Sequence, residues 1–184
     1  MKRASFNQTI FNLFLANFKE KKPMAFDLKN TVLGTATRKA TKLNMGNIFV
    51  QIFQRRDVAL FVEELNRMRL NKGKTTQDKN ITNLKTGTSK YSPTTVAIYK
   101  KIGRLVVAGQ NYTMKHTGKF HRSIKVTTIT KNYIEVTGDP MKPQVNLYKT
   151  YGTFLLGASE TDLQRLRQKV LPLILETVQK QLLE

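Results

Sequence analysis

The stretch SETDLQRLRQKVLPLILETVQKQLLE, residues 159–184, carries the clearest helical pattern in the chain. Ser159 is a suitable N-cap, and Asp162 stands at the third helical position, where a carboxylate favours a helix start. Apolar residues then recur at helical spacing and form one stripe: Leu163, Leu166, Val170, Leu173, Ile174 and Val178. Pro172 is expected to kink this helix or divide it in two, because proline lacks the N–H that a helix interior needs.

Two alternating runs precede that helix and predict a small antiparallel sheet. They are SIKVTTIT, residues 123–130, and YIEVTGD, residues 133–139, and both are rich in Thr, Val and Ile. The short Lys131-Asn132 step between them predicts a tight turn. In the first strand Ile124 and Val126 share a face and Lys125 points away. Just upstream, Thr117-Gly118 is expected to form the turn that enters this strand.

The region before the strands predicts further elements. Residues 57–70 have apolar side chains at helical spacing, and a strand is an alternative for their first half. Residues 91–103 predict a helix that is capped by Ser92, has Pro93 in its first position and ends at Gly103. The run NIFVQIFQ, residues 47–54, is short and aliphatic and favours a strand. Residues 71–90 predict a polar loop.

The first 46 residues predict an N-terminal helix followed by a basic arm. In residues 5–20, Ser5 and Gln8 fit a capping box, and Phe6, Ile10, Phe14 and Phe18 fall near one face. Such a face needs a partner surface, either in its own domain or in a neighbouring subunit. Residues 47–184 then predict a single α+β core domain: a small antiparallel sheet packed by helices, with the long C-terminal helix.

The charge of the chain is strongly one-sided. It has 32 basic and 12 acidic residues, a net charge of +20. Eleven basic residues and no acidic residue lie between Asp78 and Glu135. Lysine and arginine neutralise phosphates without reading bases, so we expect non-specific, salt-sensitive contact with DNA. The residues expected to face DNA are Lys100, Lys101, Arg104, Lys115, Lys119 and Arg122.

The sequence holds little material for catalysis. The absence of cysteine excludes thiol chemistry and thiolate metal sites. His116 and His121 are five residues apart with no carboxylate nearby. GKTT at 73–76 is not a phosphate-binding loop, because Met68 occupies the position of its first glycine. We therefore expect no enzymatic activity, metal, cofactor or small-molecule substrate. No apolar run approaches the roughly 18 residues of a membrane span, so we expect no membrane anchor.

Four short motifs stand out: Leu65, Asn66 and Leu70; Tyr91, Ser92, Pro93, Thr95, Lys100 and Gly103; Thr117, Gly118, Phe120 and Ser123; and Tyr151, Gly152, Leu156 and Gly157. Over about residues 60 to 175, they resemble a pattern found in virion structural proteins of tailed phages. This chain departs from the pattern at His116 and Lys119, where acidic residues are common in the family.

The resemblance implies a structural role in the phage neck or tail. Head–tail connector and tail-completion proteins, which are small α+β domains assembled in rings around the DNA channel, are the nearest class. It implies a homo-oligomeric ring that contacts other virion proteins of the portal, neck or tail, in a virion assembled in the host cytoplasm. The Phe-rich face at Phe6, Ile10, Phe14 and Phe18 would supply an inter-subunit contact. The alternative is a basic, non-sequence-specific nucleic-acid-binding module outside the tail, associated with packaging or with ribosomes.

Overall fold

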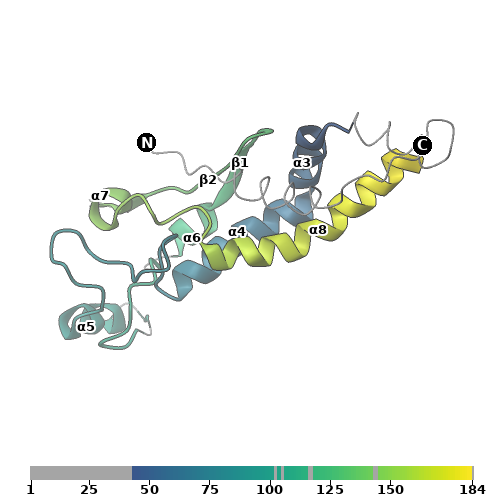
Figure 1. Cartoon of the computed structure of the whole chain (residues 1–184). Helices are drawn as coiled ribbons and strands as arrows, with labels where there is room; N and C mark the ends of the chain where they lie inside the picture. Colours follow the sequence, from purple (N-terminus) through teal and green to yellow (C-terminus); the bar gives the residue numbers. More distant parts are fainter. Residues whose placement is uncertain (1–42, 102, 105, 116–117, 143–144, 184) are drawn as a thin grey trace.

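The computed structural model describes residues 43–101, 103–104, 106–115, 118–142 and 145–183. The predicted helix at 5–20 and most of the basic arm lie outside these residues. The described part is an elongated α+β structure (Figure 1). Its elements are α3 (Met45–Gln54), α4 (Arg56–Asn71), α5 (Pro93–Lys101), α6 (Lys119–Ser123), β1 (Lys125–Ile129), β2 (Ile134–Thr137), β3 (Met141–Lys142), β4 (Val145–Asn146), α7 (Leu147–Tyr151) and α8 (Glu160–Leu183).

Helix α3 corrects the prediction of a strand at 47–54. The Asn44 side chain caps it by accepting a hydrogen bond from the Asn47 N–H at 3.1 Å. Ile48 and Ile52 are four residues apart, and both are buried on the side that faces the core, with Phe53. Burial on one helical face outweighs the modest strand preference of β-branched and aromatic residues. The helix begins at Met45, just before the predicted domain boundary.

The predicted helices at 57–70 and 159–184 are confirmed as α4 and α8. At the start of α8 the Ser159 Oγ accepts a hydrogen bond from the Asp162 N–H at 3.3 Å, and the Asp162 carboxylate accepts one from the Ser159 N–H at 3.2 Å. This reciprocal pair satisfies two donors that a helix start otherwise leaves unpaired. Pro172 does not divide α8, which continues through it to Leu183. The Pro172 side chain is exposed.

The predicted hairpin is confirmed as β1 and β2, which pair antiparallel from Lys125↔Thr137 to Ile129↔Ile134. The register shifts at Thr127, where a bulge bends the ladder. The turn closes with a hydrogen bond from the Thr130 N–H to the Tyr133 carbonyl at 2.9 Å. A second, two-residue ladder, β3 with β4, lies before α7.

The hairpin is fastened to α4 through two charged side chains of that helix. The Glu63 carboxylate accepts a hydrogen bond from the Val126 N–H at 3.2 Å. Arg67 donates to the carbonyls of His121 and Ile124, both at 3.0 Å, and to Glu63. Side chains on α4 therefore hold both the entry of β1 and the segment before it.

The apolar interior consists of two clusters. The first joins α3, α4 and α8, and its buried members are Ile48, Ile52, Phe53, Val58, Val62, Leu65, Leu166 and Val170. The second lies under α6, α7 and the loops, and its buried members are Leu70, Ile81, Met114, Phe120, Ile124, Leu147 and Leu155. The predicted burial of Phe120 and Ile124 is confirmed, and Lys125 is exposed.

A buried polar network lies between the two clusters and is centred on Arg69 of α4. Its guanidinium pairs with the Asp162 carboxylate of α8 and donates to Asn66 Oδ1 at 2.8 Å. It also donates to the backbone carbonyls of Leu155 and Gly157 at 3.1 and 3.0 Å. Burial lowers the pKa of Arg69, and the Asp162 carboxylate opposes that shift. One residue thus fixes α4, the 155–157 segment and the start of α8 relative to one another.

We predict that Arg69→Met lowers the free energy of unfolding by about 3 kcal/mol or more, because it leaves the buried Asp162 carboxylate without its cation. Urea denaturation monitored by circular dichroism measures the change. Arg165→Met, at an exposed position of α8, is the control and should change stability by less than about 0.5 kcal/mol. Adding Asp162→Leu to Arg69→Met should recover part of the loss. If Arg69→Met and Arg165→Met unfold with equal free energies, the network around Arg69 is not important for stability.

Candidate nucleic-acid and assembly surfaces

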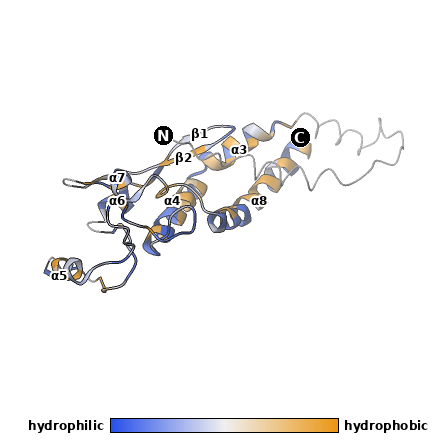
Figure 2. Cartoon of the chain, turned by 60° about the vertical axis from the view of Figure 1, so that its left-hand side comes forward, coloured by the Kyte–Doolittle hydropathy of each residue, from blue (hydrophilic) through white to orange (hydrophobic). Residues whose placement is uncertain are grey.

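Residues 89–112 leave the body of the molecule, form α5 and return to the body (Figure 2). This excursion is the α5 module. Backbone hydrogen bonds close its base. The Tyr91 N–H donates to the Gln110 carbonyl at 2.9 Å, and the Tyr112 N–H donates to the Ser89 carbonyl at 3.0 Å. Helix α5 has no buried residue. Helix α5 therefore belongs to a projecting module, while Tyr112 at the base of the module packs against the second apolar cluster.

The predicted ends of α5 are confirmed. The Ser92 Oγ accepts a hydrogen bond from the Thr95 N–H at 3.1 Å, and Pro93 is the first helical residue. At the other end, Gly103 has φ +70°, a conformation that costs glycine least, and its N–H donates to the Lys100 carbonyl at 3.1 Å. The motif residues Ser92, Pro93 and Gly103 thus have local structural roles.

Four tyrosines attach the excursion to the body. The Tyr91 ring is buried and packs against Tyr99 and Tyr112, with centroids 5.6 and 5.0 Å away. Tyr112 in turn packs edge-on against Tyr151 of α7 at 5.6 Å. Burial raises the pKa of Tyr151 to about 12 and raises that of Tyr99, so both hydroxyls stay protonated at neutral pH. These aromatic contacts connect α5 to α7.

The positive charge of the excursion is exposed. Lys100 and Lys101 occupy the last turn of α5, and both side chains are exposed. Arg104 follows, and its Nη1 donates to the Lys115 carbonyl at 3.2 Å, which brings the Lys115 backbone against it. Within the described ranges, none of these four basic side chains forms an ion pair. Four of the six residues expected to face DNA therefore lie on the excursion or beside its base.

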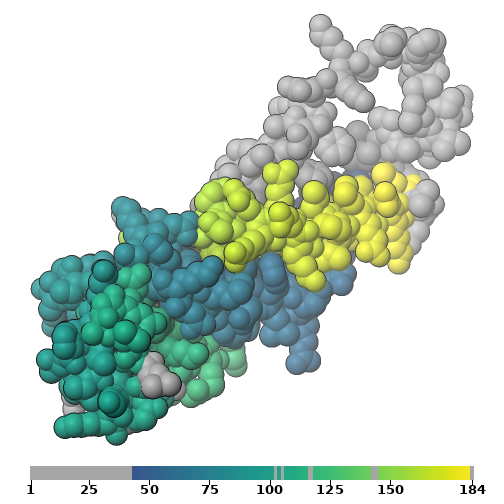
Figure 3. Space-filling model, turned by 90° about the horizontal axis from the view of Figure 1, so that it is seen from below, coloured from purple at the N-terminus to yellow at the C-terminus, as the bar shows by residue number. Residues whose placement is uncertain are grey.

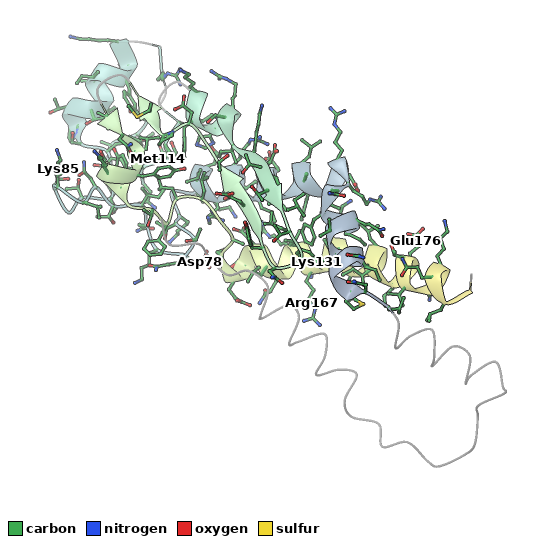
Figure 4. The ribbon with its side chains drawn as sticks, turned by 90° about the horizontal axis from the view of Figure 1, so that it is seen from above. Asp78, Lys85, Met114, Lys131, Arg167 and Glu176 are labelled. Atoms are coloured by element: carbon green, nitrogen blue, oxygen red, sulfur yellow. The ribbon has the colours of Figure 1, made fainter. Side chains whose placement is uncertain are left out.

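The other two expected DNA-facing residues, Lys119 and Arg122, lie on α6. Both are exposed, and Lys119 Nζ is 3.8 Å from the Asp139 carboxylate. The acid-free span also reaches well beyond the α5 end. Lys85 lies at that end of the molecule, whereas Lys131 lies at the hairpin turn beside α3 (Figure 4). The structure thus distributes the span over several surfaces, and the α5 group is one part of it whose side chains form no ion pair within the described ranges.

Helix α6 corrects the prediction that Thr117-Gly118 leads directly into a strand. Gly118, with φ +71°, caps a short helix over Lys119–Ser123, and β1 begins after it. The Ser123 Oγ donates to the Phe120 carbonyl and accepts from the Asp139 N–H, both at 2.8 Å. Gly118, Phe120 and Ser123 of the motif thus build a compact corner between α6 and β2. Thr117 and His116 lie outside the described residues.

His121 is a structural residue in this fold. Its side chain is buried at 6% exposure, and Nε2 lies 2.8 Å from the Thr113 carbonyl, the geometry of a donating N–H. Desolvation by burial lowers the pKa of His121. The neutral ring is therefore the stable form at neutral pH, and it joins α6 to the 111–115 segment.

The motif residues Gly152 and Gly157 also have structural roles. Gly152, with φ +89°, ends α7, and its N–H donates to the Tyr148 carbonyl at 2.9 Å. Gly157, with φ +127°, donates its N–H to Asn66 Oδ1 at 3.0 Å, and its carbonyl accepts from Arg69. Sequence reasoning had identified Gly157 and Asn66 as motif residues but not their contacts with each other and with Arg69, because the contacts to Gly157 span about ninety residues and have no local signal.

A small apolar hollow lies between β2, α4 and the start of α8, beside this network. It is lined by Val62, Leu65, Ile134, Val136, Gly157, Ala158 and Leu166, with Asn66 and Asp162 as its polar members. Both polar side chains are already bonded to Arg69 and to backbone N–H groups. The hollow thus offers apolar surface but no uncommitted polar group for a small molecule.

Among the described residues, no group of three or more His, Asp or Glu side chains could hold a metal ion. Over the same residues, no helix combines the length and the apolar character needed to cross a membrane. Comparison with known proteins adds no assignment: no family model, no curated protein and no solved structure matches the chain.

We predict that the stability of the protein falls as the pH is lowered from about 7.5 to about 5.5, a range around the ordinary histidine pKa near 6.5. The folded state lowers the pKa of His121, so protons bind preferentially to the unfolded chain below pH 6.5. His121→Gln keeps a donor for Thr113 but cannot titrate, so its melting temperature should depend less on pH. His116→Gln is the control for the other histidine. An unchanged pH profile in His121→Gln would contradict this role.

Proposed function

We propose that this chain is a structural virion protein of a tailed bacteriophage, forming a homo-oligomeric ring in the neck or tail around the DNA channel. The observation that carries the proposal is the projecting α5 module, which presents Lys100, Lys101 and Arg104 in the absence of any described acidic partner. The role is structural and requires neither catalysis nor a cofactor. The resemblance of the motif residues to phage virion proteins supports the same class.

Unpaired lysines and arginines suit a surface along which DNA moves. They neutralise phosphates wherever these lie and bind no base edge, so the contact is independent of sequence. The module that carries them is held by tyrosine packing and backbone hydrogen bonds, which keeps the charges outside the apolar core. A surface of this kind facing a ring lumen would hold DNA without fixing its register.

A ring also needs surfaces that its neighbours can cover, and the described part exposes several large apolar side chains. Leu84, Ile98 and Val107 are 65%, 56% and 69% exposed; Ile98 and Val107 lie on the α5 module, and Leu84 lies in the loop before it. Exposed apolar residues are common on monomers, and neighbouring subunits would cover these in the proposed ring. In addition, the predicted Phe-rich face of residues 5–20 lies outside the described part and would add a second contact. Portal, neck and tail proteins would be the further partners.

The alternative is a basic module that binds nucleic acid outside the tail, in packaging or on ribosomes. The same unpaired charges support it. The two proposals differ in assembly: the ring requires neighbouring copies of the chain, whereas the module would bind DNA as a monomer. An experiment that separates DNA binding from assembly therefore discriminates between them.

We predict that reversing the charges of Lys100, Lys101 and Arg104 to Glu weakens binding to duplex DNA and lowers its salt dependence, with the slope of log K against log salt reduced by about 3. The oligomeric state, measured by light scattering, should not change, because the α5 charges face the lumen and not the neighbour. Reversal of Arg165, Arg167 and Lys169 on α8 is the matched control, since these exposed residues lie elsewhere on the molecule. Equal losses of DNA binding in the two triple variants would show that α5 is not the DNA-facing surface.

A further inference from the structure

The second half of α8 carries an apolar stripe that neither apolar cluster fully covers. Leu171, Leu175 and Val178 recur at spacings of four and three residues and so share one side of the helix. Leu175 is 46% exposed, and Leu171 and Val178 are half-buried. By contrast, Leu166 and Val170 in the first half are buried against α3 and α4. Helix α8 runs along the surface of the face seen in Figure 3.

The described part begins at Leu43, two residues before α3. Leu43, the first described residue, packs against the same apolar cluster as Val178. Helix α3, which begins at Met45, packs against α8. The described part therefore begins beside the apolar cluster against which Val178 of α8 also packs.

The sequence of that N-terminal part provides a matching apolar face. Phe6, Ile10, Phe14 and Phe18 fall on one side of a helical stretch at 5–18. Residues 19–42 then join it to Leu43, and a 24-residue connection reaches up to about 80 Å when extended. Helix α8 itself is only about 36 Å long, from its 24 residues. The connection is thus long enough for the segment to reach a neighbouring copy.

We infer that residues 5–18 of one copy pack as a helix on the Leu171–Leu175–Val178 stripe of the next copy. The inference rests on the proposed ring. A ring closes through heterologous contacts, in which two different patches on each subunit meet. The Phe-rich segment and the α8 stripe are two such patches. Stripe-on-stripe packing would instead be isologous and would end at a dimer.

Cysteine cross-linking tests this contact directly, because the chain has no cysteine of its own. Phe14→Cys and Leu175→Cys are placed on separate full-length chains with tags of different size, mixed, and oxidised with diamide. We expect a mixed dimer at about twice the 21.1 kDa chain mass on a non-reducing gel. Glu176→Cys replaces Leu175→Cys in the control, since this exposed residue lies about 100° further around the helix and should give little mixed dimer.

The other outcomes overturn the inference in distinguishable ways. A cross-link found only when both cysteines are on one chain would place the segment on its own α8. A dimer of two Leu175→Cys chains would mean stripe-on-stripe packing. Oligomers seen by light scattering without the mixed cross-link would refute this contact and leave the proposed ring intact. A monomer at all concentrations with no cross-link would refute both.

Discussion

The buried pairing of Arg69 with Asp162 is the interaction on which the rest of this structure depends. It joins the middle of α4 to the first turn of α8, and the same guanidinium orders the Leu155 and Gly157 carbonyls that lead from α7 into α8. Asp162 is at once its ion-pair partner and the residue that closes the cap of α8. Because a buried charge is costly without its partner, the pair specifies one arrangement of these elements and disfavours others. The buried Arg69 Nε has no hydrogen-bond partner among the described residues. The arrangement therefore leaves one buried donor unsatisfied, which lowers stability.

The surface charge depends on that framework through a series of contacts. Helix α7 packs in the second apolar cluster through Leu147. Tyr151 of α7 packs against Tyr112, and Tyr112 packs against Tyr91 at the base of the α5 module. The module can therefore project Lys100 and Lys101 into solvent while its base stays ordered. With a net charge of +20, the chain repels itself, and a nearby anion such as DNA relieves that repulsion. The buried network that joins α4 to α8 is thus separate from the exposed lysines of the α5 module.

Local signals in the sequence were sufficient for the α+β class, for α4, α5 and α8, and for the hairpin. Caps such as Ser92 and Ser159 and the alternation of the strands act over a few residues and can be read directly. The strand prediction at 47–54 was wrong because its β-branched and aromatic composition obscured the four-residue spacing of Ile48 and Ile52. Helix α6 was missed because a five-residue helix leaves no periodicity to detect.

The candidate surfaces were predictable only in part, because they depend on contacts far apart in the sequence. The acid-free span identified the basic residues, but not that Lys119 lies near Asp139 while the α5 charges stay unpaired. The pairing of Arg69 with Asp162 spans 93 residues and gives no local pattern. The exposure of Ile98 and Val107 follows from the projection of the α5 module, which composition alone does not reveal.

The proposed arrangement of the ring can be tested in one image. Lys101→Cys introduces a single thiol on α5, which a maleimide-gold label marks in negative-stain micrographs of the purified protein. The account predicts annular particles with gold at the rim of the central hole, where the α5 charges would meet DNA. Particles that remain single subunits, or rings with gold on their outer rim, would contradict it.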